Sequence, residues 1–161
     1  MRNVTPKKWL SQHFLKDKEI IAKFLDAADL IENENVLEIG PGHGAITDAL
    51  LKKDLSLIAV EKDPILFKEL KKKYSSCSNF SLYEADILDF PLEQLPSPIK
   101  VVANIPYSIT APLLGKLLTK RDIFSSLTLI VQKELALRMV AKIGSSEMSR
   151  FTHFVQYYSH P

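Results

Sequence analysis

Three glycines, spaced Gly-x-Gly-x-Gly, follow a short apolar run in the first third of the chain. Residues 36–44 (VLEIGPGHG) join an expected strand to an expected helix. Without a Cβ, Gly40, Gly42 and Gly44 let the backbone turn tightly and let a ligand approach main-chain N–H groups. Dinucleotide-binding enzymes carry Gly-x-Gly-x-x-Gly instead, so the early third glycine, with Glu38 before it, predicts another kind of cofactor loop. The alternative is a turn that uses glycine for geometry alone.

Two carboxylates stand at the ends of later apolar runs. Glu61 follows Gly40 by about 20 residues, the distance at which a carboxylate can bind both ribose hydroxyls of a nucleoside. Asp86 follows the third run and could accept a hydrogen bond from an adenine amino group, because open α/β sheets bind ligands at this edge. The alternative for Glu61 is an exposed strand end. Asp89 is the competing candidate for the role of Asp86, but it better suits a loop or cap.

The fourth apolar run ends in Asn104-Ile105-Pro106-Tyr107. The Asn104 side-chain oxygen and the Ile105 carbonyl are neutral acceptors that together can hold both hydrogens of an exocyclic amine. They would aim the nitrogen lone pair at an electrophile, with no covalent intermediate. Tyr107 offers a flat face for an extruded base, and such stacking contributes roughly 1–3 kcal/mol. We therefore expect catalysis on a base amine here.

Alternating apolar runs and stretches of helical spacing predict an α/β fold with a mostly parallel sheet flanked by helices. The expected strands are residues 36–39, 56–60, 80–83, 100–103 and 127–131. Expected helices include Ile46 to Leu50, one from the Asp63 cap and Pro64 to about Tyr74, one opened by Thr110 and Pro112, and 134–143 ended by Gly144. Residues 90–98, with three prolines, predict a linker-like loop.

The composition fits one soluble globular domain, with 161 residues, 46% hydrophobic and 25% charged. Cys77 is the only cysteine, which excludes an intramolecular disulfide and a Cys-based zinc site and favours a reducing, cytoplasmic location. The four scattered histidines predict no metal site. No run approaches the roughly 20 apolar residues of a membrane span, and no signal-peptide core is present. The net charge of +2 does not by itself indicate nucleic acid.

With these motifs the chain resembles the ribosomal RNA small-subunit adenine dimethyltransferases. Besides the glycine loop at 38–44 and residues 104–107, the likeness rests on three segments. Residues 11–15 (SQHFL) look like the family's Q-N-F-L element, residues 131–134 read VQKE, and residues 149–158 are similar to its R-x-x-x-x-x-Q-Y-Y stretch. The resemblance therefore extends from Ser11 to Tyr158.

The resemblance implies a Rossmann-like class I methyltransferase fold, S-adenosylmethionine as cofactor, and N6,N6-dimethylation of adenosines in 16S-type ribosomal RNA during small-subunit maturation. The implied partner is small-subunit ribosomal RNA or the pre-30S particle, with no membrane, and we expect a monomer. The implied catalytic residues are Asn104, Ile105, Pro106 and Tyr107. The implied cofactor-binding residues are His13, Leu15, Glu38, Gly40, Gly42, Gly44, Glu61, Asp86 and Asn104, with His13 replacing the usual Asn.

Family members continue into two further strands and a helical domain that helps grip RNA. We therefore expect residues 1–161 to be the methyltransferase domain of a truncated chain, ending after the fifth strand and the following helix. Its own RNA affinity should be poor. The basic residues expected near the RNA are Lys7, Lys8, Lys16, Lys116 and Arg138.

Two alternatives stay open. Macrolide-resistance enzymes methylate an adenine of large-subunit RNA with the same loop and N-I-P-Y, although residues 132–134 and 156–158 look more like the small-subunit group. A non-catalytic RNA-binding relative could keep the fold and lose turnover. The intact Asn104 and Tyr107 argue against it.

Overall fold

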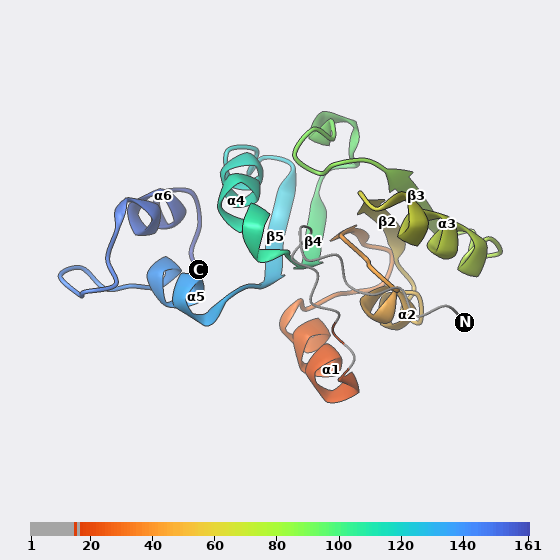
Figure 1. The fold of residues 1–161 in the computed structure, drawn as a ribbon, viewed down its shortest axis with the longest axis horizontal. Helices are drawn as coiled ribbons and strands as arrows, with labels where there is room; N and C mark the ends of the chain where they lie inside the picture. The colour runs from red at the N-terminus through yellow and green to blue at the C-terminus, as the bar shows by residue number, and fades with distance from the viewer. Residues whose placement is uncertain (1–14, 16) are drawn as a thin grey trace.

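Five parallel strands form the centre of the structure, a computed structural model that describes Leu15 and residues 17–161 (Figure 1). Their order in the sheet is β3-β2-β1-β4-β5. The strands are β1 (Asn35–Ile39), β2 (Ser56–Glu61), β3 (Phe80–Glu84), β4 (Ile99–Asn104) and β5 (Phe124–Ile130). This confirms the predicted α/β fold and all five strands, of which β5 begins at Phe124, earlier than expected.

Six α-helices and two short 3-10 helices accompany these strands among the described residues. They are α1 (Lys18–Ala27), α2 (Ala45–Leu50), α3 (Pro64–Lys73), η2 (Leu92–Gln94), η3 (Tyr107–Ile109), α4 (Thr110–Leu118), α5 (Lys133–Met139) and α6 (Arg150–Tyr158). In Figure 1, α5 and α6 lie beyond β5, at the end of the molecule opposite α3. In the part of the chain the structure describes, we find no helix with the length and apolarity to span a bilayer.

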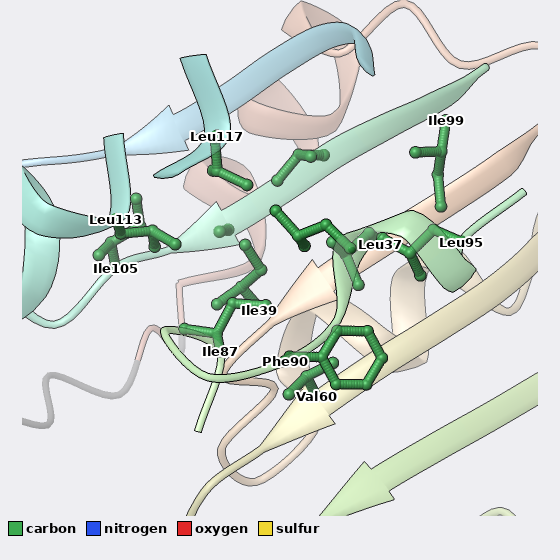
Figure 2. Packing of buried hydrophobic residues seen from close by; sticks show 13 residues of the cluster. Leu37, Ile39, Val60, Ile87, Phe90, Leu95, Ile99, Ile105, Leu113 and Leu117 are labelled. Carbon is green, nitrogen blue, oxygen red and sulfur yellow. The ribbon is translucent and has the colours of Figure 1, made fainter. Parts of the chain in front are cut away.

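Alternate residues of the strands supply two cores, one on each face of the sheet. On one face, Leu37 and Val101 pack with Leu113 and Leu117 of α4, as Figure 2 shows for Leu37, Leu113 and Leu117. On the other face, the strand residues pack against α1 and α2, through Phe24, Leu25, Ile46 and Leu50 among others. The continuous apolar runs of the strands follow from this double coverage.

The prediction for α3 is confirmed at both ends. The Asp63 side chain accepts the amide of Ile65 at 2.8 Å, and Pro64 occupies the first helical turn. Three lysines stand in the last turn, where they complement the helix dipole. Local sequence signals are therefore sufficient to delimit this helix.

The prediction of a helix over 134–143 is wrong at its end. Helix α5 stops at Met139, and Gly144 lies beyond it with φ +85°. Side chains of α6 bind the carbonyls near this end. Gln156 donates to the Met139 and Ala141 carbonyls, both at 3.0 Å, and Thr152 donates to the Arg138 carbonyl at 2.7 Å. Side chains of α6 thus supply the hydrogen bonds that another turn of α5 would have given these carbonyls.

The proline-rich segment 90–98 is a packed part of the core and not a linker. Phe90, Leu92 and Leu95 are buried in the same cluster as Leu37. The segment also contains the turn η2, and Figure 2 shows Phe90 and Leu95 beside the strands. The loop prediction holds, but the segment closes one face of the sheet.

Candidate active site

A cleft of about 150 Å³ lies at the carboxyl edge of the sheet and is lined from the ends of four strands. Gly40 follows β1, Glu61 ends β2, Asp86 follows β3 and Pro106 follows β4. After β1 the chain moves outward to β2 and β3, then returns to place β4 on the other side of β1. Ligands of open α/β sheets bind at such a reversal. The cleft therefore brings together four of the predicted site residues.

Glu61 organises the backbone around this cleft. Its carboxylate is 5% exposed, and it accepts the Gly42 amide at 3.0 Å and the Asp63 amide at 2.8 Å. Burial raises the pKa of Glu61, and the hydrogen bonds from Asp63 and Gly42 oppose that rise. The alternative, an exposed strand end, is thus excluded for Glu61.

Glu38 lies behind the glycine loop, buried on the α2 side of β1. One carboxylate oxygen accepts the Thr47 hydroxyl at 2.7 Å, and the other has no hydrogen-bond partner among the described residues. Burial raises the pKa of Glu38 to about 8, although the Thr47 hydrogen bond acts in the opposite direction. A buried oxygen without a partner is costly, and in the neutral carboxyl this oxygen can carry the proton, so Glu38 is a candidate hydrogen-bonding group for a ligand at the loop.

The glycine loop is held from the far side by Tyr74, which follows α3. The Tyr74 hydroxyl donates to the Asp48 carboxylate at 2.8 Å and lies 3.1 Å from the Gly44 carbonyl. Gly44 has φ +83°, a left-handed conformation that L side chains rarely adopt, and a Cβ there would lie 2.3 Å from the hydroxyl. Lys73 pairs with the other Asp48 oxygen at 2.7 Å. Glycine is therefore required at position 44 by both backbone and space.

Asp86 has both carboxylate oxygens engaged. One forms an ion pair with Lys62, and the other accepts the Leu88 amide at 3.0 Å. Burial alone raises the pKa of Asp86, but the Lys62 and Leu88 hydrogen bonds outweigh it and hold the pKa below its usual range. The carboxylate is thus charged at neutral pH, and an incoming amino group would share an oxygen with one of these donors.

The predicted catalytic segment leaves the end of β4 and turns into η3. Asn104 is half-buried, Ile105 is 1% exposed and Tyr107 is 41% exposed. The Ile105 amide donates to the Ile130 carbonyl at 3.3 Å, and the Pro106 carbonyl accepts the Ile109 amide at 3.1 Å. This anchored turn sets Pro106 in the cleft wall and leaves the Tyr107 ring accessible.

Other predicted residues lie away from the cleft lining or outside the description. His13 is not among the described residues. Leu15 packs against the α1–α2 core, and it does not line the cleft. The Lys116 ammonium, expected near the RNA, donates to three backbone carbonyls of the loop after β3.

Several contributors escaped the sequence analysis. Lys62 and Ser108 line the cleft, while Thr47 and Tyr74 hold the residues behind it. Lys62 directly follows Glu61, so its place at the strand end was a usable signal. Tyr74 had none, because its partner Gly44 is 30 residues away.

The polar groups of the described residues suit a nucleoside ligand with an amino-acid tail. Gly40 has φ +66° and open space where a Cβ would be, so a ligand can approach its backbone. The carboxylates of Glu61 and Asp86 line the cleft and can accept hydrogen bonds. No group of three His, Cys, Asp or Glu side chains that could hold a metal occurs within the described part of the chain.

Comparison with known proteins places these features in a family. A family model described as "Ribosomal RNA adenine dimethylase" matches residues 3–160. Ribosomal RNA small subunit methyltransferase A of Protochlamydia amoebophila is 44% identical, over 98% of this chain and 58% of its own length. The chain spans between 55% and 60% of the length of the first curated relatives it matches.

Two solved structures share the fold and more than 30% of the aligned residues. The dimethyladenosine transferase of Plasmodium falciparum matches with a TM-score of 0.77 and 37% identity, over 87% of this chain and 50% of its own. The 23S rRNA methyltransferase ErmE matches with a TM-score of 0.76 and 32% identity, over 87% of this chain and 55% of its own. With the family match covering nearly every residue, the chain belongs to the ribosomal RNA adenine dimethylase family.

Proposed function

We propose that residues 1–161 form the S-adenosylmethionine-binding catalytic domain of an enzyme that dimethylates adenosine N6 in small-subunit ribosomal RNA. The observation that carries this proposal is the convergence at one sheet edge. The Asn104-to-Tyr107 turn leaves β4 beside a cleft whose other walls hold Gly40, Glu61 and Asp86. Family membership supports the same reaction.

The cofactor would lie along the carboxyl ends of the strands. Glu61 would bind the ribose hydroxyls, Asp86 the adenine amino group, and the backbone from Gly40 to Gly44 the methionine end. Glu38 would lie behind that end, where its neutral carboxyl has one oxygen without a partner that could hydrogen-bond the ligand. His13 and Leu15 join this set through the family resemblance. When bound, the cofactor supplies a methyl group on a positively charged sulfur.

Asn104 and Ile105 would act on the target base. An adenine amine is a poor nucleophile because its lone pair is shared with the ring. The Asn104 oxygen and the Ile105 carbonyl would hold its two hydrogens, free the lone pair and stabilise the positive charge that develops on nitrogen. N6 would then take the methyl group that the cofactor supplies and release a proton to solvent. Tyr107 would hold the base by stacking.

The small subunit is the favoured substrate. Curated relatives at 44% and 46% identity carry the name of small-subunit methyltransferases, whereas the matched large-subunit enzyme is 32% identical. We place the protein in the cytoplasm, acting as a monomer on pre-30S particles. A 23S-directed activity is the second candidate, carried by the TM-score of 0.76 to ErmE.

Transfer of radioactive methyl groups by the complete gene product tests the proposal. Undermethylated 30S particles, 50S particles and protein-free 23S RNA are offered separately, with Asn104→Ala as the control for background. We expect N6,N6-dimethyladenosine in the 30S RNA alone, in two successive transfers. Label confined to 23S RNA would establish the second candidate, and no label on any RNA would contradict the proposal.

A further inference from the structure

Lys116 lies in the last turn of α4 and reaches across to the loop that follows β3. Its ammonium donates to the carbonyls of Ile87 at 3.0 Å, Leu88 at 2.8 Å and Phe90 at 2.6 Å. An ammonium has three protons, so these three carbonyls use its whole donor capacity. The side chain is partly buried and its charge is directed into the protein.

The loop that Lys116 binds forms one wall of the cleft. Asp86 accepts the Leu88 amide with its side chain, and its carbonyl accepts the amides of Asp89 at 3.0 Å and Phe90 at 2.9 Å. Ile87 is 4% exposed and lines the cleft beside Asp86. The backbone of this loop is thus a tight turn. Lys116 donates hydrogen bonds to three of its carbonyls that do not accept within the turn.

The helix that carries Lys116 also begins at the catalytic segment. Helix α4 starts at Thr110, whose hydroxyl donates to the Pro106 carbonyl at 3.2 Å. Leu113 and Leu117, on either side of Lys116 in sequence, are fully buried under the sheet and fix the helix. A single ammonium therefore connects the Asp86 wall to the rigid helix that follows Asn104 to Tyr107.

We propose that Lys116 is a positioning residue that holds the adenine-binding wall of the cofactor cleft against α4, and that it makes no contact with RNA. The inference rests on the proposed cofactor site and adds a residue to it. Charge-assisted hydrogen bonds to three convergent carbonyls suit an ammonium, which is a compact point charge. Without it, three partly buried carbonyls lose their donor and the loop loosens.

The test is Lys116→Met, which keeps an unbranched apolar side chain and removes the ammonium donors. Calorimetry with S-adenosylhomocysteine and with 5′-methylthioadenosine should show about 10-fold weaker binding of both, by the same factor, because both contain the adenosine end. Hydrogen exchange at the amides of Leu88, Asp89 and Phe90 should become faster in the ligand-free protein.

Lys120→Met is the matched control. Lys120 follows the same helix, is exposed and pairs with the Glu93 side chain at 2.6 Å. Its replacement should leave both affinities and the exchange of the loop unchanged. Lys116→Arg keeps the charge but spreads its donors over a planar group, so it should restore only part of the affinity.

The outcomes separate the inference from the proposed function. If the wild-type chain binds neither ligand, the cofactor site itself is wrong. Wild-type binding with equal affinity in Lys116→Met overturns the inference alone, even if the melting temperature falls. Unchanged cofactor affinity with weaker, less salt-dependent RNA binding would make Lys116 an RNA contact instead. If Lys116→Met does not fold, full wild-type affinity in Lys116→Arg overturns the inference.

Discussion

The Glu61 carboxylate lies 3.0 Å from the Gly42 amide nitrogen, and this hydrogen bond ties the end of β2 to the glycine loop after β1. Its second oxygen accepts the Asp63 amide at the start of α3. One buried carboxylate thus fixes the loop before any ligand arrives. Preorganisation of this kind reduces the ordering that binding must supply.

Replacing Glu61 should weaken cofactor binding more than it weakens the fold. Glu61→Gln keeps one acceptor oxygen but loses the charge, so affinity for S-adenosylhomocysteine should fall by about 1.5–3 kcal/mol. Because burial raises the pKa of Glu61, the neutral glutamine avoids burying a charge. Its NH2 group would nevertheless face one of the two amides that Glu61 accepts, so the free energy of unfolding should fall by about 1 kcal/mol. Titration calorimetry and urea unfolding measure the two effects.

Glu84 provides the control for this change. Glu84 lies opposite Glu61 in the register of β2 and β3, and it is exposed at the end of its strand. Glu84→Gln should leave the affinity unchanged. Equal affinity in Glu61→Gln and wild type would remove Glu61 from the site.

A methyl group at Gly44 should destabilise the protein strongly. Gly44→Ala places a Cβ 2.3 Å from the Tyr74 hydroxyl, in a backbone conformation with φ +83°. The strain and the overlap together should reduce the free energy of unfolding by about 2–4 kcal/mol. In the Gly44→Ala/Tyr74→Phe double variant the overlap with the hydroxyl is removed, so the two effects should be less than additive.

Gly115→Ala is the matched comparison. Chemical denaturation measures Gly44→Ala, the Tyr74→Phe single variant, the double variant and Gly115→Ala. Gly115 lies within α4 with open space where a Cβ would be, so alanine there should stabilise by about 0.5–1 kcal/mol. Full additivity in the double variant would mean that Tyr74 does not limit space at position 44.

The partners of Gly44 also mark the limit of what the sequence could predict. Local signals could be predicted from the sequence. They include the glycine spacing, the Asp63-Pro64 start of α3 and the ends of the strands. Tyr74 was not, since its hydroxyl reaches a loop 30 residues away and nothing local selects that partner.

The contacts of Lys116 and the helix α1 were not predicted, for different reasons. A lysine suggests a surface charge, and only tertiary packing turns its ammonium toward three carbonyls. Helix α1 did have a local signal. Asp17 caps its amides at Glu19 and Ile20, and the buried Ile21, Phe24 and Leu25 follow at helical spacing.

The stability of the protein should depend on pH through Glu38. Its pKa is raised to about 8 in the fold, against 4.5 normally, so the folded state holds a proton that the unfolded state releases between these values. Stability from this group is fully present below about pH 4.5 and is lost as pH rises toward 8. Glu38→Gln cannot ionise and escapes that loss.

The measurement is urea unfolding of wild type and Glu38→Gln between pH 5 and pH 9. The free energy of unfolding of the variant, minus that of wild type, should increase with pH by an amount on the order of a few kcal/mol. Taking the difference cancels the titration of all other groups that behave alike in both proteins. A difference that stays constant across this range would mean that Glu38 ionises normally.

The catalytic segment makes the most specific prediction about chemistry. In the complete gene product, Asn104→Ala should slow methyl transfer by a factor on the order of 10²–10³, as loss of one preorganised acceptor does elsewhere. Tyr107→Phe keeps the ring for stacking and should be mild, whereas Tyr107→Ala should be severe. Since Tyr107 is 41% exposed, neither change should leave a large cavity, and effects on rate can be read separately from folding. Single-turnover methylation of 30S particles distinguishes the variants. A Tyr107→Phe enzyme as inactive as Tyr107→Ala would mean that the hydroxyl takes part in the reaction, and the stacking role would have to be abandoned.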